Sequence, residues 1–112
     1  MRRTSRPAIL ALLLALAACA QGGERSAEAL YRSYCGRCHA ADGKGDPRSL
    51  PLYPNLDLTR SALVRDRARG ALYSRIAEGI GPMPGFSHRL EHSEIESLVD
   101  FVLRFQPRKA GK

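Results

Sequence analysis

Two cysteines stand three residues apart in the stretch YCGRCHAADGKGD, and a histidine follows the second cysteine directly. Cys35, Cys38 and His39 could serve three kinds of chemistry: a redox-active dithiol, half of a zinc site, or the covalent attachment of a haem. Each kind needs different partners elsewhere in the chain. The remaining sequence can therefore be used to choose between them.

The dithiol and the zinc site are the weaker interpretations. A thioredoxin-like dithiol would need a βαβ pattern around it, and no stretch of the chain alternates apolar and polar residues like a half-buried strand. A zinc site could add His88 and His92 to the two cysteines, since both spacings are ones that zinc ligands use. However, the gap between the two pairs is far longer than the usual finger spacing, and this site would leave His39 without a role.

Haem attachment accounts for all five residues of CGRCH. On one helical turn, two thiols can add to the two vinyl groups of a haem while the adjacent imidazole reaches the iron, and C-x-x-C-H is the sequence signature of this linkage. Cys35 and Cys38 would form the two thioethers, and His39 would be the proximal iron ligand. A haem of this kind needs a second axial ligand.

The stretch GIGPMPGF offers that second ligand. Met83 stands between two prolines, which exclude it from a helix interior, and the nearby glycines let the backbone approach a flat ligand closely. A methionine that only fills a core is rarely held between prolines on a loop. We therefore expect Met83 to be the distal ligand, with His88 and His92 as less favoured alternatives.

The N-terminus has the pattern of an export signal. Three arginines among the first six residues precede an unbroken apolar run, AILALLLALAA, which is too short for the roughly 20 residues that cross a bilayer as a helix. The next residues complete LAAC, which resembles a bacterial lipoprotein box. We expect 1–18 to be a cleaved signal, Cys19 to carry lipid, and 19–25 to be a tether. In lipoproteins of this type the residue after the lipid-bearing cysteine influences the choice of membrane. Here that residue is Ala20 rather than an aspartate, which favours the outer membrane over the inner one.

Apolar periodicity predicts three main helices. The first has Ser26 as its N-cap and the second lies at about 72–80. The last begins at a capping box formed by Ser93 and Glu96, and its apolar stripe ends before Pro107.

A long proline-containing stretch, 41–68, separates the first two helices and is mostly irregular apart from a helical turn in LTRSALVRD. A haem would give three leucines of this stretch, Leu50, Leu52 and Leu56, an apolar surface to cover.

These motifs make the chain resemble a class I monohaem cytochrome c over about residues 26–106. The stretches CGRCHAADGKG, YPNL and MPGF carry the resemblance. It implies an all-α fold, with three main helices and long loops wrapped around one covalently bound haem c. The domain would span 26–107, followed by a basic tail at 108–112. Within YPNL, the resemblance implies that the Pro54 carbonyl accepts a hydrogen bond from the His39 ring.

The resemblance also implies a crossing of the first and last helices. Ala27 and Tyr31 on the first would meet Phe101 on the last, with Ala27 where the family often has glycine. The chain has no tryptophan, which several members of the family use against a haem propionate. The side chains that could take over this contact are Arg48, Tyr53 and Arg60.

Electron transfer rather than enzyme catalysis is the function that this resemblance implies, with unidentified redox proteins as donor and acceptor. With both axial positions filled, no substrate reaches the iron. Two alternatives remain: a dedicated cytochrome subunit of a periplasmic dehydrogenase, and a sensor or peroxidase-like protein whose Met83 is displaceable. We expect a monomer or a subunit of a redox complex, anchored by lipid and facing the periplasm.

The number and placement of the charged residues do not indicate a nucleic-acid-binding protein. The chain has 18 Lys and Arg against 11 Asp and Glu, and cleavage before Cys19 removes three arginines, which lowers the formal net charge from +7 to +4. Basic and aromatic residues do not interleave as in nucleic-acid-binding proteins. The remaining basic residues either form a solvated surface or steer an acidic redox partner, and they are Arg65, Arg67, Arg69 and the tail.

Overall fold

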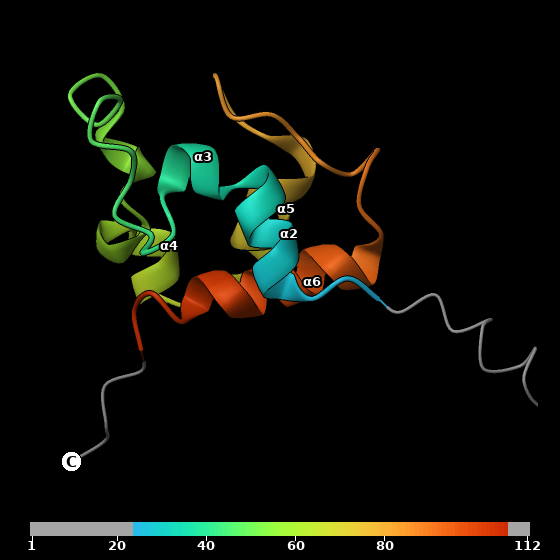
Figure 1. Ribbon diagram of the computed structural model, residues 1–112. Coiled ribbons are helices and arrows are strands. Elements are labelled where there is room, and N and C mark those ends of the chain that lie inside the picture. The colour runs from blue at the N-terminus through green and yellow to red at the C-terminus, as the bar shows by residue number, and fades with distance from the viewer. Residues whose placement is uncertain (1–23, 108–112) are drawn as a thin grey trace, which may run out of the picture.

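The computed structural model describes residues 24–107 of the chain. These residues form helices joined by loops (Figure 1). In chain order they are α2 (Ala27–Tyr34), α3 (Gly36–His39), the 3₁₀ turns η1 (Pro54–Leu56) and η2 (Leu58–Arg60), α4 (Ala62–Arg65), α5 (Arg69–Glu78) and α6 (His92–Leu103). Within 24–107 there is no strand, only one isolated bridge between Ile80 and Met83. The predicted all-α fold is confirmed.

Helix α2 begins at the predicted N-cap. The Ser26 hydroxyl oxygen accepts a hydrogen bond from the Ala29 amide at 3.2 Å, which satisfies one of the free amides of the first turn. Leu30 and Tyr31 form the buried face of α2 and pack toward α6. The ring centroids of Tyr31 and Phe101 lie 4.8 Å apart, as the resemblance implied.

Helix α6 begins two residues earlier than predicted, with Glu91 as its N-cap, and the predicted capping box of Ser93 and Glu96 is wrong. The box is formed by Glu91 and Glu94: each carboxylate accepts a hydrogen bond from the backbone amide of the other residue. Arg25 explains this choice, because its guanidinium donates to both Glu94 carboxylate oxygens at 2.8 and 2.9 Å and so fixes the residue that completes the box.

The hydrophobic core lies between α2, α5 and α6, with a contribution from α4. Burying an aliphatic side chain of this kind contributes about 1.5–3 kcal/mol, so these residues hold the three main helices together. The least exposed large side chains are Leu30, Val64, Ile95, Leu98 and Val99. In Figure 1, α6 runs along one side of the domain, and α3 lies on the opposite side.

The long segment between α3 and α4 contains only single turns, as predicted. LTRSALVRD forms η2 and α4, η1 precedes it, and the remainder is irregular. None of the helices between residues 24 and 107 is long and apolar enough to cross a membrane. The predicted signal, Cys19 and the basic tail lie outside the described residues.

Candidate functional site

Helix α3 brings the cysteines and the histidine of CGRCH onto one turn. Cys35 is the N-cap of α3, and its carbonyl oxygen accepts hydrogen bonds from the amides of Cys38 and His39 at 3.1 and 2.9 Å. The Cys35 amide donates to the Tyr31 carbonyl at 2.8 Å, which ties this turn to the end of α2. The turn is therefore placed by the main helix that precedes it.

The glycines that follow α3 fold the chain back onto it. The Gly45 amide donates to the His39 carbonyl and the Asp46 amide to the Cys38 carbonyl, both at 2.8 Å. Gly43 and Gly45 have φ of 74° and 88°, a left-handed conformation that side chains disfavour. The two carbonyls at the end of α3 are thus satisfied by backbone donors.

The His39 ring is oriented by a backbone carbonyl. Its Nδ1 lies 2.9 Å from the Leu56 oxygen. A carbonyl oxygen can only accept, so Nδ1 carries a proton, and in the neutral ring Nε2 then has the lone pair that can bind a metal. The predicted acceptor, Pro54, is wrong: its carbonyl accepts the Asp57 amide at 3.3 Å within η1, and the acceptor for His39 is two residues further along the same YPNL motif.

The two thiols are free, with Cys35 partly buried and Cys38 exposed. Burial, and to a smaller extent the neighbouring Cys38, raises the pKa of Cys35 to about 11. A redox-active dithiol needs a thiolate, and hence a lowered pKa, near neutral pH. This environment therefore speaks against the dithiol interpretation.

Met83 lies in a tight turn that follows α5. The amide of Ile80 donates to the Met83 carbonyl at 3.0 Å, and the Met83 amide donates back to Ile80 at 2.9 Å. Gly79 has φ of 75°, and a side chain there would collide with the Met83 carbonyl oxygen. The Phe86 amide anchors the end of the loop to the Ile76 carbonyl of α5 at 3.0 Å. The Met83 side chain is partly buried and packs against the core.

The α3 turn and the Met83 loop lie on the same side of the domain. In Figure 1 this loop, in light orange, rises past α3, and both lie opposite α6. The irregular segment after α3, in green, rises on that side as well. Helix α3 and the segment that follows it thus share one side with the Met83 loop, which is distant from both in the sequence.

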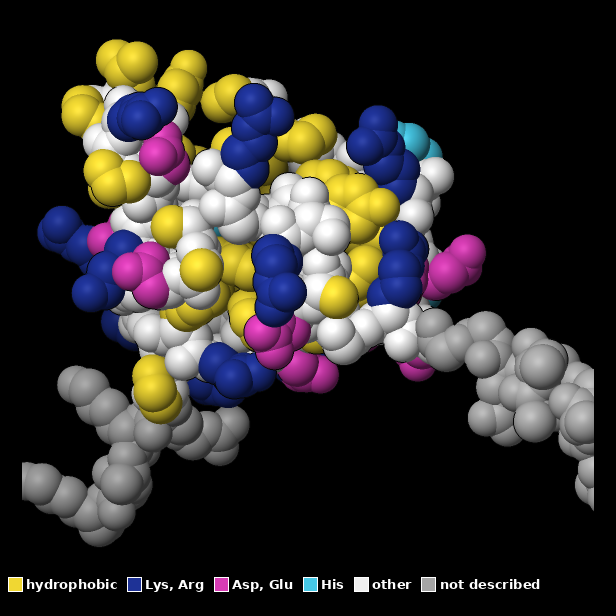
Figure 2. Space-filling view, in the orientation of Figure 1, with side chains coloured by type: hydrophobic (Ala, Val, Ile, Leu, Met, Phe, Trp, Pro, Cys, Tyr) yellow, Lys and Arg dark blue, Asp and Glu magenta, His cyan; other side chains and the backbone are white. Residues whose placement is uncertain are grey.

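Large apolar side chains are exposed on two of these segments. Leu52 is 77% exposed, Ile80 55% and Tyr53 47%, whereas Leu50 and Leu56 are partly buried. Figure 2 shows hydrophobic side chains gathered at the top of the view, where these loops lie. Exposed apolar side chains that gather into one patch are a feature of ligand sites.

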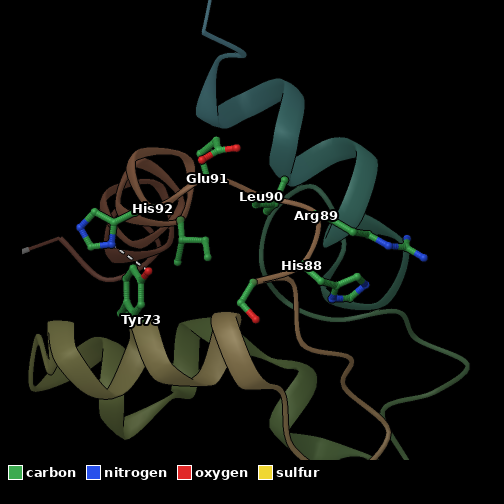
Figure 3. A pocket seen from close by; sticks show the side chains of 8 residues that line it. Tyr73, His88, Arg89, Leu90, Glu91 and His92 are labelled. Atoms are coloured by element: carbon green, nitrogen blue, oxygen red, sulfur yellow. Dashed lines mark hydrogen bonds between the residues drawn. The ribbon is translucent and has the colours of Figure 1, made fainter.

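The two other histidines line a surface pocket beside α5 and α6. His92 Nδ1 is 2.8 Å from the Tyr73 hydroxyl, so its ring joins α6 to α5. Figure 3 shows His92 and Tyr73 in this surface pocket, with the side chains of His88 and Arg89 pointing away from them. In residues 24–107 no group of three or more His, Cys, Asp or Glu could hold a metal ion. The zinc interpretation therefore finds no support.

The donor set of this side of the domain fits a haem. It has two thiols on one turn, an imidazole with a free Nε2, a thioether held in a rigid loop, and exposed apolar side chains. Sequence reasoning missed the Leu56 carbonyl, although the YPNL motif that contains it was recognised.

Comparisons with known proteins agree with this fit. The family model described as "Cytochrome C oxidase, cbb3-type, subunit III" matches residues 22–102. The chain is also similar to a protein of Pseudomonas aeruginosa named "Dihydro-heme d1 dehydrogenase", with 35% identity over 100 residues. That similarity covers 89% of this chain and 19% of the relative, so the chain spans about a fifth of the length of the relative.

Proposed function

Because the chain belongs to the family of cytochrome c oxidase cbb3-type subunit III, we propose that it is an electron carrier with one covalently attached haem c. In this proposal Cys35 and Cys38 bind the haem, His39 is the proximal iron ligand and Met83 the distal one. The contact of His39 Nδ1 with the Leu56 carbonyl carries the proposal, because it leaves Nε2 free to bind iron.

A haem held in this way supplies an iron that takes up and gives off one electron. The hydrogen bond to the Leu56 carbonyl raises the basicity of the His39 ring and fixes its orientation. The Met83 thioether is a soft neutral donor that favours Fe(II), which raises the reduction potential. If His39 and Met83 both bound the iron, no position on it would stay open for a substrate, so we propose that the domain has no enzyme activity of its own.

A pyridine haemochrome spectrum combined with mass spectrometry of the mature protein tests this function. We expect the spectrum of a haem bound through two thioethers, and a mass increased by one haem. Cys35→Ala with Cys38→Ala should abolish this covalent mass. A wild-type protein with no covalent haem would contradict the proposal.

A second candidate is a cytochrome module of a dehydrogenase. The similarity to part of a protein named for dehydrogenase activity favours it, since the matching segment there belongs to a much longer chain. Co-purification at native expression level separates the two candidates: a stoichiometric larger subunit supports the module, and its absence supports the free carrier.

We also propose that lipid on Cys19 anchors the protein to a membrane, with the outer membrane favoured, and that the domain faces the periplasm. The LAAC box and the preceding apolar run support this location. Lipoproteins of this type carry several acyl chains, and two or more such signals suffice for stable anchoring. The electron donor and acceptor would then be redox proteins within reach of that membrane.

A further inference from the structure

The residue that follows His39 has an unusual backbone conformation. Ala40 has φ of 60° and ψ of 162°. This region is almost confined to glycine, because a Cβ atom clashes there with the backbone. A residue with a side chain stays in such a conformation only where its surroundings hold it.

A buried tyrosine supplies such a restraint. The Tyr31 hydroxyl donates a hydrogen bond to the Ala40 carbonyl at 2.7 Å. Its side chain runs along α3, since a Cβ atom on Gly36 would lie 3.9 Å from the Tyr31 ring. The side chain of Tyr31 thus spans the turn that carries the cysteines and the histidine.

Packing of the main helices fixes where this hydroxyl lies. Tyr31 is 2% exposed, and its ring lies 4.8 Å from that of Phe101 and 5.4 Å from that of Phe105. Burial also raises the pKa of Tyr31 above its usual range, so the hydroxyl keeps its proton and remains a donor. The Ala40 carbonyl is therefore tied to the rigid contact between α2 and α6.

We propose that the Tyr31 hydroxyl is a positioning group for His39: it holds the strained turn at Ala40 and thereby sets the orientation of the His39 ring. This inference rests on the proposed role of His39 as an iron ligand. Other contacts restrain His39 itself, among them those from the Gly45 amide to the His39 carbonyl and from Nδ1 to the Leu56 carbonyl. The contact from Tyr31 to Ala40 differs from these because it uses the side chain of another residue, so a substitution can remove it alone.

Loss of the hydroxyl should weaken the His39–Leu56 hydrogen bond. Without it, Ala40 can relax toward a favourable conformation, which rotates the peptide that joins it to His39. A weaker hydrogen bond makes the imidazole less basic, and a less basic imidazole stabilises Fe(III) less. The reduction potential should then rise.

The test compares Tyr31→Phe with Tyr34→Phe in the full-length, haem-loaded protein. Tyr34 is a matched control, because its hydroxyl contacts Arg25 at 3.3 Å and not the turn at Ala40. For Tyr31→Phe we expect a raised potential and a second set of ferric low-spin resonance signals, from a second ring orientation. Tyr34→Phe should keep the wild-type potential and a single set.

Ala40→Gly gives an independent readout. Glycine adopts this conformation without strain, so Tyr31→Phe should shift the potential less in the Ala40→Gly background than in wild type. If Tyr31→Phe alone takes up no haem, recovery of haem attachment in the double variant supports the inference, and continued failure overturns it.

The outcomes separate this inference from the proposed function. If wild type shows covalent haem with His and Met ligation but Tyr31→Phe loses only stability and keeps its potential and its single set of signals, the positioning role is wrong. An equal potential shift in the Ala40→Gly background would also overturn it. A wild type with no covalent haem would overturn the proposed function first.

Discussion

Removal of one side chain, that of Met83, should separate haem attachment from iron ligation. The proposed thioether linkages use Cys35 and Cys38, which lie on a different segment from the Met83 loop. We expect Met83→Ala to keep covalent haem, to lose the sulfur-to-iron charge-transfer band and to have a lower reduction potential, because the soft donor that favours Fe(II) is gone. Carbon monoxide should then bind the ferrous protein readily. Absorption spectroscopy and potentiometry measure these effects.

The two exposed histidines provide the controls for Met83. His92 is engaged with Tyr73, and His88 lines the same surface pocket. His88→Ala and His92→Ala should leave the band and the potential unchanged. Loss of the low-spin spectrum in either histidine variant, or absence of the band from wild type, would show that Met83 is not the distal ligand.

At this scale the sequence predicts which side chains come together better than which backbone groups they contact. Cys35, Cys38 and His39 were predicted to share one helical turn because their types and spacing match one linkage signature, and α3 places them on that turn. The carbonyl acceptor was misplaced by two residues, from Leu56 to Pro54, because every residue has a carbonyl and only the turn η1 decides which one faces the ring.

At the scale of the helices, the C-terminal end of α5 positions the loop that carries Met83. Gly79 terminates α5 and touches the backbone of the Met83 loop. Gly79→Ala should lower the free energy of unfolding by about 1–3 kcal/mol, because φ of 75° is strained for alanine and the added Cβ meets the Met83 carbonyl. The variant should also weaken the charge-transfer band, since the loop must shift.

Gly70→Ala is the matched control for Gly79→Ala. Gly70 lies within α5 and has open space around it, so alanine there should raise the free energy of unfolding by about 0.5–1 kcal/mol. Denaturant unfolding of both variants measures the difference. Equal effects of the two substitutions would show that the end of α5 does not position the loop.

The N-terminus of α6 gives the fold a dependence on pH. Hydrogen bonds from Arg25, and then from the Glu91 amide, lower the pKa of Glu94 below its ordinary value of 4.5. The stabilisation from this carboxylate is therefore complete above pH 4.5 and is lost as the pH falls through the lowered pKa. Glu94→Gln should destabilise the protein at pH 7 and lose most of this difference in strong acid.

Glu96→Gln is the control for this pH effect. Glu96 pairs with Arg69 at 3.0 Å on the exposed surface, where an ion pair contributes little. Unfolding in urea between pH 7 and pH 2 measures both variants. A difference between Glu94→Gln and wild type that stays constant over this range would contradict the linkage.

Helices were largely predictable from the sequence, and the loops were not. Apolar periodicity and the Ser26 cap located α2, because these signals are local. The start of α6 was misplaced because two overlapping patterns, Ser93 with Glu96 and Glu91 with Glu94, both fit a capping box, and Arg25, distant in sequence, selects one. The segment before α4 also uses contacts distant in sequence, since the Gln106 amide group donates to the Leu58 and Ser61 carbonyls.

At the scale of the whole molecule, the structure shows that the basic residues considered for steering a partner are largely paired. Residues 24–107 contain twelve Lys and Arg against eleven Asp and Glu, so the described domain is almost neutral. Of the three arginines considered for steering, Arg65 pairs with Asp66, Arg69 pairs with Glu96, and Arg67 donates to a backbone carbonyl. Long-range attraction of a partner by these arginines is therefore weak, and the basic excess of the mature chain lies mainly in 108–112.

The proposed anchoring of the whole molecule to a membrane can be tested by one substitution at Cys19. The structure holds Arg25, the last residue of the predicted tether, to Glu94, so the domain begins within a few residues of Cys19. We expect Cys19→Ser to move the protein from the membrane fraction to the soluble fraction, because the lipid is the proposed anchor. The haem site lies on distant residues, so the released protein should keep its haem. Fractionation with haem staining measures both, with Ala20→Ser as a control that should remain in the membrane fraction. Cys19→Ser protein that stays there would contradict the lipid anchor.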